Sequence, residues 1–518
     1  MIGNRGRGAC LDGLEGNANI VTATPLPIEH QFTTTPDGFV RLVGRLTAFA
    51  SNTVMALIEN GASLGSRQLD VGNSGRNDKE SLMGSRQTSA TTRSVLSWPT
   101  GLTVHDRGRA SPGYTLLTPF GSPIVYLLDA GGEVLHMWFV STGPAQRMTL
   151  HAKYVGGGHI LFAPGHGGEG WTREESPAGD WLYEMDWHGN VVWSYAPDGP
   201  PEDPHGLRSI LGWDPRYKPW GPHHDFQRLP NGNTILLCGE ALTDADISDH
   251  ELRSDYFLEV APDGTPVWVW HSDQHYGEFG FGEEARRLIR QAPGLHMGLG
   301  LGDYLHTNTL EVLPDTPLGR RDPRFRATNI LSCQRNTNTI FVVDRESSRV
   351  VWTWGREELV GPHHPTMLDD GHILVYDNGG LAGYPRRARP YTRLVELDPE
   401  SGKIVWTYRD HHRSFYHQRF FSMSWGTAQR LPNGNTFSLD ANLGRLFEVT
   451  PDGEIVWEYV NGFLGSVVRG GGQKIDNGIY RAYRLPYDSV PDFSRDFDFR
   501  SDEPPKESTL LSQPRFDY

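Results

Sequence analysis

The sequence predicts an all-β protein, a six-bladed β-propeller of four-stranded antiparallel blades, because two short patterns alternate along the chain. One is a hairpin in which two runs of alternating apolar and polar residues flank a turn rich in Gly, Asp, Asn and Ser. The other is a turn dipeptide followed by a short apolar strand. Together they supply four strands per unit, and six such units close most simply around an axis, which leaves only short, protected sheet edges.

The hairpin pattern recurs six times and ends each time in an aromatic residue. The copies are Val125 to Trp138, Leu182 to Tyr195, Phe257 to Trp270, Phe341 to Trp354, Leu394 to Tyr408 and Leu446 to Tyr459. One supersecondary unit repeated at long intervals indicates a repeat architecture.

The turn-and-strand pattern lies between the hairpins. Complete copies are Val155 to Phe162, Leu229 to Leu237, Leu368 to Tyr376 and Leu431 to Leu439. A degenerate copy at Leu313 to Asp315 is followed by an insertion before the predicted strand Ala327 to Ser332.

The longest insertion runs from Ser272 to Tyr304 and contains the segment EEARRLIRQ, which predicts a helix over Glu283 to Gln291. Shorter insertions are Pro200 to Pro219 and Ala241 to Asp255. Because insertions in repeat proteins map to loops, often on the binding face, we interpret the longest as a lid or wall over the channel mouth. A plain surface excursion is the alternative.

The predicted domains are an N-terminal extension over 1–108, the propeller over 109–465 and a C-terminal tail over 466–518. Within the extension, Ile20 to Glu59 can be read as a few strands. Gly61 to Ser97 is rich in Ser, Gly, Thr, Arg and Asn and is predicted to be a flexible loop. The tail is rich in proline and charge, and we expect it to wrap over the surface as extended chain.

Composition narrows the partners and the location. A formal net charge of -15 argues against a nucleic-acid partner, because phosphate binding needs a concentrated basic face. No apolar run is long enough for a membrane span or a secretory signal, so we predict no membrane partner and a cytoplasmic or unknown location. Cys10, Cys238 and Cys333 match no zinc or redox spacing and predict no disulfide framework. The oligomeric state is left open, with a homodimer as one option.

Histidines recur where the chain enters the first strand of a blade. His224 and His363 each stand eight residues before a turn glycine, whereas His151 and His306 stand seven residues before the corresponding turn positions. Such segments lead toward the central channel of a propeller, so we expect these side chains to converge.

Two of these histidines have a histidine neighbour, His223 and His364. Because neighbouring strand residues point opposite ways, we expect one histidine of each pair to face the channel, and the register from the turn selects His224 and His363.

The histidine cluster is compatible with two chemistries. Neutral imidazoles could bind a divalent transition metal and serve a lyase or hydrolase. Alternatively, one imidazole could be a nucleophile among cationic groups that hold an anionic substrate. Arg335 favours the second, because a guanidinium suits sulfate, phosphate or carboxylate oxygens and not a metal site. A non-catalytic binding module remains a third reading.

The order of these motifs resembles the arylsulfotransferase family, the aryl-sulfate sulfotransferases that use no nucleotide sulfate donor. The resemblance covers roughly Gly113 to Phe463 and rests on HHDFQRLPNGNTILL, LHTNTLEVLPD, ILSCQRNTNTIFVVDRESSRVVWTWG and HHPTMLDDGHILVYDNGG, followed by AQRLPNGNTF and LFEVTPDGEIVWEY. It implies a six-bladed propeller that moves a sulfuryl group from a phenolic sulfate to a phenol through a transiently sulfurylated histidine, without a cofactor.

Carried over residue by residue, the resemblance makes His363 the nucleophile. His224, His306 and Arg335 would hold the sulfuryl oxygens or protonate the leaving phenolate, and Asn308 would position His306. We expect the substrate-binding residues His223, His364, His151 and Asn308 to surround a small aromatic anionic substrate.

Three departures from the family stand out. Family members of the bacterial periplasm carry an export signal and a cysteine pair near the site, and this chain shows neither. His364 stands where the other copy has Asp225. The N-terminal region does not resemble the family's β-sandwich domain.

Overall fold

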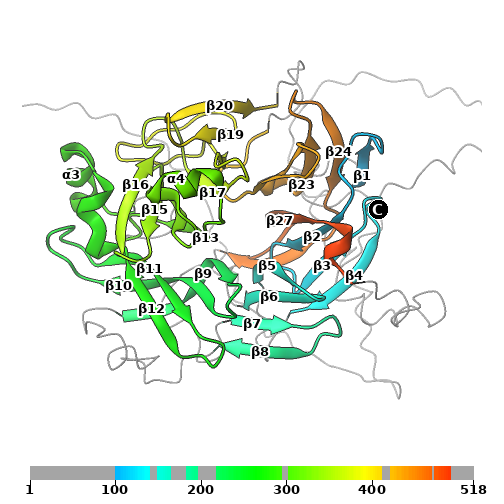
Figure 1. The fold of residues 1–518 in the computed structure, drawn as a ribbon, viewed down its shortest axis with the longest axis horizontal. Coiled ribbons are helices and arrows are strands. Elements are labelled where there is room, and N and C mark those ends of the chain that lie inside the picture. Colours follow the sequence, from blue (N-terminus) through cyan, green and yellow to red (C-terminus); the bar gives the residue numbers. More distant parts are fainter. Residues whose placement is uncertain are drawn as a thin grey trace, which may run out of the picture. The chain divides into compact units, whose positions relative to one another are not determined.

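The structure, a computed structural model, describes residues 100–140, 149–164, 182–195, 218–294, 302–410, 420–469 and 472–491. It confirms the predicted six-bladed β-propeller (Figure 1). The strands and the loop predicted within residues 20–97, and the tail beyond residue 491, lie outside the described residues.

Five blades follow the chain order from the axis outward, with strands joined as antiparallel neighbours. Blade 2 consists of β5 (Thr149–Gly156), β6 (His159–Pro164), β7 (Leu182–Met185) and β8 (Val191–Tyr195), and blade 3 of β9 (Lys218–Arg228), β10 (Thr234–Leu242), β11 (Leu252–Val260) and β12 (Pro266–His271). Blade 4 consists of β13 (Thr307–Val312), β14 (Ile330–Gln334), β15 (Thr339–Asp344) and β16 (Arg349–Trp354), and blade 5 of β17 (Pro362–Met367), β18 (Ile373–Asp377), β19 (Arg393–Asp398) and β20 (Lys403–Tyr408). Blade 6 consists of β21 (Ala428–Arg430), β22 (Thr436–Asp440), β23 (Arg445–Val449) and β24 (Ile455–Val460).

Blade 1 is built from both ends of the described chain. Its outer strands are β2 (Tyr114–Pro119), β3 (Ile124–Leu128) and β4 (Val134–Phe139), and its axial strand is β27 (Ile479–Leu485), which pairs with β2 (Figure 1). β1 (Gly101–His105) adds a fifth strand to blade 6 beside β24. The predicted propeller boundaries of 109 and 465 are therefore too narrow at both ends. β27 escaped the sequence analysis because IYRAYRL carries neither repeated pattern.

The hairpin pattern corresponds to the two outer strands of each blade, and its tryptophans tie each blade to the next. Six indole nitrogens donate hydrogen bonds of 2.8 to 3.2 Å to a carbonyl in the outer turn of the following blade. The donor–acceptor pairs are Trp138 to Asp186, Trp193 to Pro262, Trp270 to Ser348, Trp354 to Gly402, Trp406 to Pro451 and Trp457 to Ala130. The last pair joins blade 6 to blade 1, so the set of bonds is circular.

The remaining short elements lie in connections. They are η1 (Asp273–Phe279), α3 (Glu283–Gln291), α4 (Pro317–Arg321), η2 (Pro323–Phe325), η3 (Ala441–Leu443), η4 (Tyr487–Ser489) and the hairpin of β25 (Gly465–Arg469) and β26 (Gly472–Asp476). No helix in the described ranges is long and apolar enough to cross a membrane.

The helix predicted in the longest insertion is α3, with the predicted bounds. It buries Ala285 and Ile289 in the hydrophobic core of blades 2 to 4, and Figure 1 shows it at the outer rim of the blades. The helix itself therefore does not cover the axis, contrary to the lid interpretation, because its apolar side already packs against the blade.

A buried ion network crosses the axis. Asp225 of β9 accepts from Arg481 of β27 (Nη1–Oδ2, 2.8 Å) and from Lys153 of β5 (Nζ–Oδ1, 2.6 Å). Arg481 also donates to the carbonyl oxygen of Asn308 and to Oγ1 of Thr309, both on β13. The backbone N–H of His364 on β17 donates to the same Thr309 oxygen. Five axial strands are thus joined through one charged cluster.

We predict that replacing Asp225 with alanine destabilises the protein by about 3 to 5 kcal/mol, because the Arg481 and Lys153 charges lose their counter-charge at the axis. The midpoint of urea unfolding, followed by circular dichroism, measures the effect. As a control, Asp106→Ala removes a carboxylate from an exposed pair with Arg109 and should leave the midpoint unchanged. Equal midpoints for both variants would contradict a central role for the network.

Candidate active site

Four successive blades begin with a residue in the left-handed backbone region. These residues are His224 (φ 57°), His306 (φ 54°), His364 (φ 46°) and Trp425 (φ 69°). Residues other than glycine are sterically strained in this region. They adopt it only where their surroundings hold them there, often at functional sites. The repeated strain marks the axial ends of blades 3 to 6.

The left-handed residues disrupt the alternation expected from sequence. In β9, His223, His224 and Asp225 stand opposite the single residue Leu237, whereas in β17 two residues, His364 and Pro365, stand opposite Val375. Counted from the Gly-Pro that precedes both pairs, His224 therefore corresponds to His364 and not to His363. The bulges of β9 and β17 thus differ by one residue, and His224 and His363 nevertheless lie at the same end of the axis.

His363 is held in a defined tautomer. Its Nδ1 lies 2.7 Å from Oδ1 of Asn378 and 3.1 Å from the carbonyl oxygen of Gly361. The Asn378 amide nitrogen donates to the carbonyls of Ser422 and Trp425, which fixes its oxygen toward the ring. Because both neighbours of Nδ1 are acceptors, Nδ1 carries the proton and Nε2 presents its lone pair.

His363 is also held neutral. Burial lowers its pKa well below the ordinary value, and the positive charges of Arg335 and His306 lower it further. A cationic neighbour was expected from the sequence, but burial is the larger cause. A neutral imidazole with an unprotonated Nε2 is the nucleophilic form.

His306 lies beside a carboxylate that the sequence analysis missed. Its Nδ1 is 2.5 Å from Oδ2 of Asp303, and its ring centroid is 4.8 Å from that of His224. Burial raises the pKa of Asp303, but the attraction and hydrogen bond of His306 outweigh burial and leave that pKa below its ordinary value. An ionised carboxylate on Nδ1 directs Nε2 of His306 away from Asp303, as in an oriented general acid or base.

His223 and His224 form a second chain of contacts. Their Nδ1 atoms are 2.7 Å apart, and Nε2 of His223 lies 3.1 Å from Oδ1 of Asp255 on β11. The rings of His223 and His224 therefore contact each other instead of pointing in opposite directions, and His223 links His224 to β11 of the blade.

Arg335 provides a buried cation near His363. The residue is 1% exposed, and burial lowers its pKa to about 10, still far above neutrality. Its guanidinium donates to Oδ1 of Asn336 and to the carbonyl oxygen of Leu381, and its backbone N–H donates to the carbonyl oxygen of His306. Among the described residues it forms no ion pair with a carboxylate, in contrast to Arg481. Such a guanidinium is a binding group for an anion.

The other predicted substrate-binding residues make contacts within the protein. His151 bonds to the carbonyl oxygen of His224 and to the Tyr483 hydroxyl, and His364 bonds to the Thr427 hydroxyl. Burial, then Arg481, lowers the pKa of both histidines, so they lie by the ion network. Asn308 donates to the carbonyl oxygen of Pro362, on the strand that carries His363. Their predicted roles toward a substrate stay predictions.

The family model described as arylsulfotransferase (ASST) matches residues 183–462, which is more than half of the chain and spans blades 2 to 6. The chain belongs to the arylsulfotransferase family. No curated protein matches it. The family assignment confirms the resemblance read from the motifs.

Three solved structures are distantly similar to this family member. A protein of unknown function from Bacteroides caccae is 14% identical over 72% of this chain and 99% of that one, with a TM-score of 0.40. A streptogramin B lyase is 11% identical over 74% and 93% of the two chains (TM-score 0.36). Virginiamycin B lyase from Staphylococcus aureus is 12% identical over 77% and 97% (TM-score 0.35). Likeness at this level says nothing about what the arylsulfotransferase-family chain does.

Sequence reasoning missed Asp303, Asp255 and Asn378 in this arylsulfotransferase-family site. Asp303 stands three residues before His306, and Asn378 follows the strand beside His363, so both lay within or next to the recognised motifs. The contacts that these residues make depend on backbone turns whose direction the sequence spacing does not reveal. The described cysteines, Cys238 and Cys333, are buried free thiols, while Cys10 lies outside the described residues.

Metal-ligating side chains meet closely at two places within the part of the chain that the structure describes. One group is Glu240, His271 and Asp273, and the other is Asp370, His372 and Glu396. Neither group includes a histidine of the axial cluster, which consists of His224, His306 and His363. Metal chemistry at the axial histidines stays a prediction.

Because several of its histidines are buried, we predict that the free energy of unfolding of this arylsulfotransferase-family protein falls in acid. Burial lowers the pKa of His151 from 6.5 to about 3, so the folded state stays neutral while the unfolded state takes up a proton. The unfolded state thus binds more protons below about pH 6.5, and the free energy of unfolding should fall by about 1.4 kcal/mol per pH unit down to about pH 3.

His151→Gln should flatten this acid slope between about pH 6 and pH 4, measured by urea unfolding at several pH values. The exposed His250, changed to glutamine, is the matched control and should keep the wild-type slope. An unchanged slope in His151→Gln would show that His151 does not titrate with unfolding.

Proposed function

We propose that this protein is a transferase that moves a sulfuryl group from a small aryl sulfate to a phenolic acceptor, with His363 as the covalent nucleophile. The observation that carries the proposal is the placement of an arginine without a carboxylate partner in the described structure, Arg335, next to a neutral histidine whose Nε2 holds the lone pair. Membership of the arylsulfotransferase family supports the same reaction class.

In the first step, the lone pair of His363 Nε2 attacks the sulfur of the ester. The bond from sulfur to the aryl oxygen breaks, and the aryl oxygen leaves with the electron pair. His306 or His224 gives it a proton, so a phenol departs. The sulfurylated ring of His363 is then cationic, and its Nδ1 proton remains shared with Asn378 and the Gly361 carbonyl.

In the second step, a phenolic acceptor attacks the same sulfur. Its hydroxyl proton returns to the histidine that acted as acid, the bond from Nε2 to sulfur breaks, and Nε2 regains its lone pair. Asp303 suits His306 to both directions of proton transfer, because the carboxylate stabilises the imidazolium that gives up its proton in the first step and is regenerated in the second.

Arg335 would hold the oxygens of the sulfuryl group through both steps. Charge on these oxygens and on the bridging oxygen grows toward the transition state, and a fixed buried donor needs no reorganisation to stabilise it. The backbone N–H of Trp425 donates to Nε2 of His363 at 3.4 Å, so a further donor lies where the sulfuryl group would be held. All of these groups belong to the chain, so the proposed reaction needs no cofactor.

We predict that His363→Asn lowers turnover of a chromogenic phenyl sulfate with a phenolic acceptor at least about 1,000-fold, because the nucleophile is lost. Wild-type protein incubated with the donor alone should release phenol and gain one SO₃ group on His363, detected by mass spectrometry of peptides.

His372→Asn is the matched control, since it replaces a histidine in a turn of the same blade. It should keep turnover and labelling. A His363→Asn variant that turns over normally, or a label on another residue, would refute the assignment.

We further predict that Arg335→Gln lowers kcat about 100- to 1,000-fold, the effect typical of removing one donor from a developing oxyanion. Steady-state kinetics with the same donor and acceptor measure it. Arg320→Gln, at an exposed arginine of the same blade, should match wild type. If Arg335→Gln raised only KM, the guanidinium would bind the substrate without acting on the transition state.

A further inference from the structure

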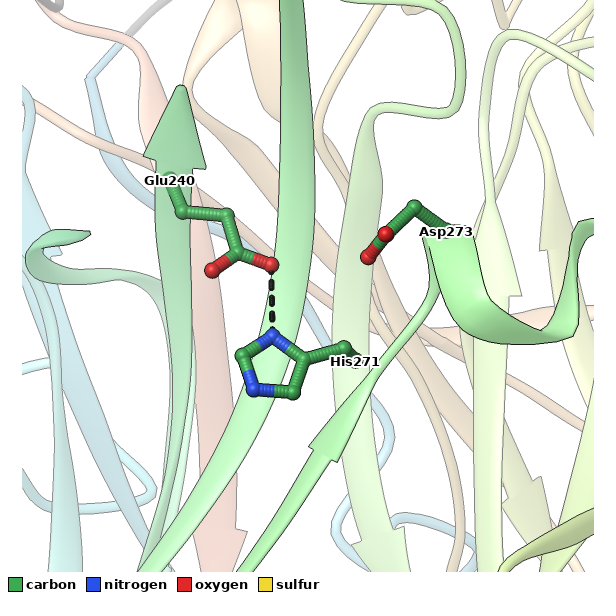
Figure 2. A group of neighbouring side chains, drawn as sticks. All are labelled: Glu240, His271 and Asp273. Atoms are coloured by element: carbon green, nitrogen blue, oxygen red, sulfur yellow. Dashed lines mark hydrogen bonds and ion pairs between the residues drawn. The ribbon is translucent and has the colours of Figure 1, made fainter. Parts of the chain in front are cut away.

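A second cluster of chemically capable side chains lies within blade 3, away from the axial histidines. Glu240 is on β10, His271 ends β12, and Asp273 begins η1. One ligand atom from each lies within 4.8 Å of the others, and their residues are 0%, 5% and 6% exposed. Figure 2 shows the Glu240 carboxylate directed at the His271 ring and the Asp273 carboxylate turned toward both.

The Glu240 carboxylate is incompletely satisfied. Oε1 accepts from Nδ1 of His271 at 2.8 Å, whereas the buried Oε2 has no hydrogen-bond partner among the described residues. No lysine or arginine in the described ranges forms an ion pair with Glu240. Leaving a buried carboxylate oxygen without a donor or a cation is costly.

The surrounding charges increase this cost. The carboxylates of Asp273 and Asp255 lie near that of Glu240. Three buried carboxylates thus act on one another. A cation would relieve the repulsion and give Oε2 a partner.

From this placement we infer that Glu240, His271 and Asp273 form a binding site for one divalent transition-metal ion, of the type of zinc or manganese. One imidazole nitrogen with two carboxylate oxygens suits these ions, whereas calcium and magnesium prefer oxygen ligands throughout. The inference is independent of the proposed sulfuryl transfer, because none of the three residues belongs to the axial cluster.

The other metal-like group shows what a satisfied arrangement looks like. Near Asp370, the ring of His372 bonds to Oε1 of Glu396 at 2.7 Å, and Arg430 donates to Oε2 of the same glutamate at 2.6 Å. There a guanidinium already neutralises the second oxygen. Within the part of the chain that the structure describes, no such cation contacts Glu240, so the two clusters form a natural pair of test and control.

An ion at Glu240 would fix the start of the longest insertion. Asp273 is the first residue of η1, and Asp303, the partner of His306, lies near the other end of the same insertion. The ion would therefore join β10 and β12 to the segment that leads to the axial site.

The test is metal binding by the full chain. Protein treated with a chelator and dialysed is titrated with zinc and, separately, with manganese by calorimetry, and the bound ion is counted by elemental analysis after gel filtration. We expect one tightly bound equivalent of at least one of these ions and a rise in the thermal midpoint when it is added. Glu240→Gln should lose the equivalent and the thermal shift, and Asp370→Asn should keep both.

Circular dichroism in the presence of chelator shows whether Glu240→Gln folds. If it does not, Asp273→Asn is measured in the same way. Absence of a tight equivalent in the wild type, equal binding by the folded Glu240 or Asp273 variant, or loss of binding in Asp370→Asn would each overturn the site.

Discussion

The structure depends on one constraint at its axis: the carboxylate of Asp225 must find its counter-charges on strands that are far apart in the sequence. Lys153 comes from blade 2 and Arg481 from the closing strand β27. Charges buried this deeply are tolerated only when they are paired with good geometry, so the network admits few alternative arrangements of the axial strands. Because His224 directly precedes Asp225, and His364 bonds to the Thr309 hydroxyl that Arg481 also contacts, the same constraint sets the position of the candidate catalytic groups.

Two buried arginines show how this scaffold separates structure from chemistry. Arg481 is paired with the Asp225 carboxylate and donates to an oxygen of β13, whereas Arg335 has neutral partners among the described residues. The first is a structural charge. The second keeps its electrostatic attraction for an anion from outside, and it also holds down the pKa of His363. Left-handed histidines and an incompletely neutralised guanidinium are both costly to folding, and their concentration at one end of the axis is the usual sign of a functional site.

Sequence periodicity was enough to predict the blades, because the outer hairpins and inner turns are local patterns of alternating burial. The histidines followed from comparing equivalent positions, and His224, His306, His363 and Arg335 do gather. Contacts that depend on distant partners could not be predicted in this way. Arg481 lies on a strand without either pattern, and the roles of Asp303 and Asn378 depend on turns whose directions no spacing reveals. The one-residue difference between the bulges of β9 and β17 also misaligned His364, since register from a turn glycine assumes an unbroken strand.

Closure of blade 1 by β27 determines when during its synthesis the propeller can first be completed. The ribosome releases a chain from its N-terminus, so all three axial histidines emerge well before Ile479–Leu485. Until that strand is inserted, Asp225 lacks Arg481, and blade 1 lacks its axial strand. A nascent chain that already contains the complete set of candidate catalytic residues therefore still lacks part of the propeller that positions them, and completion of the fold waits for the final blade strand to be translated.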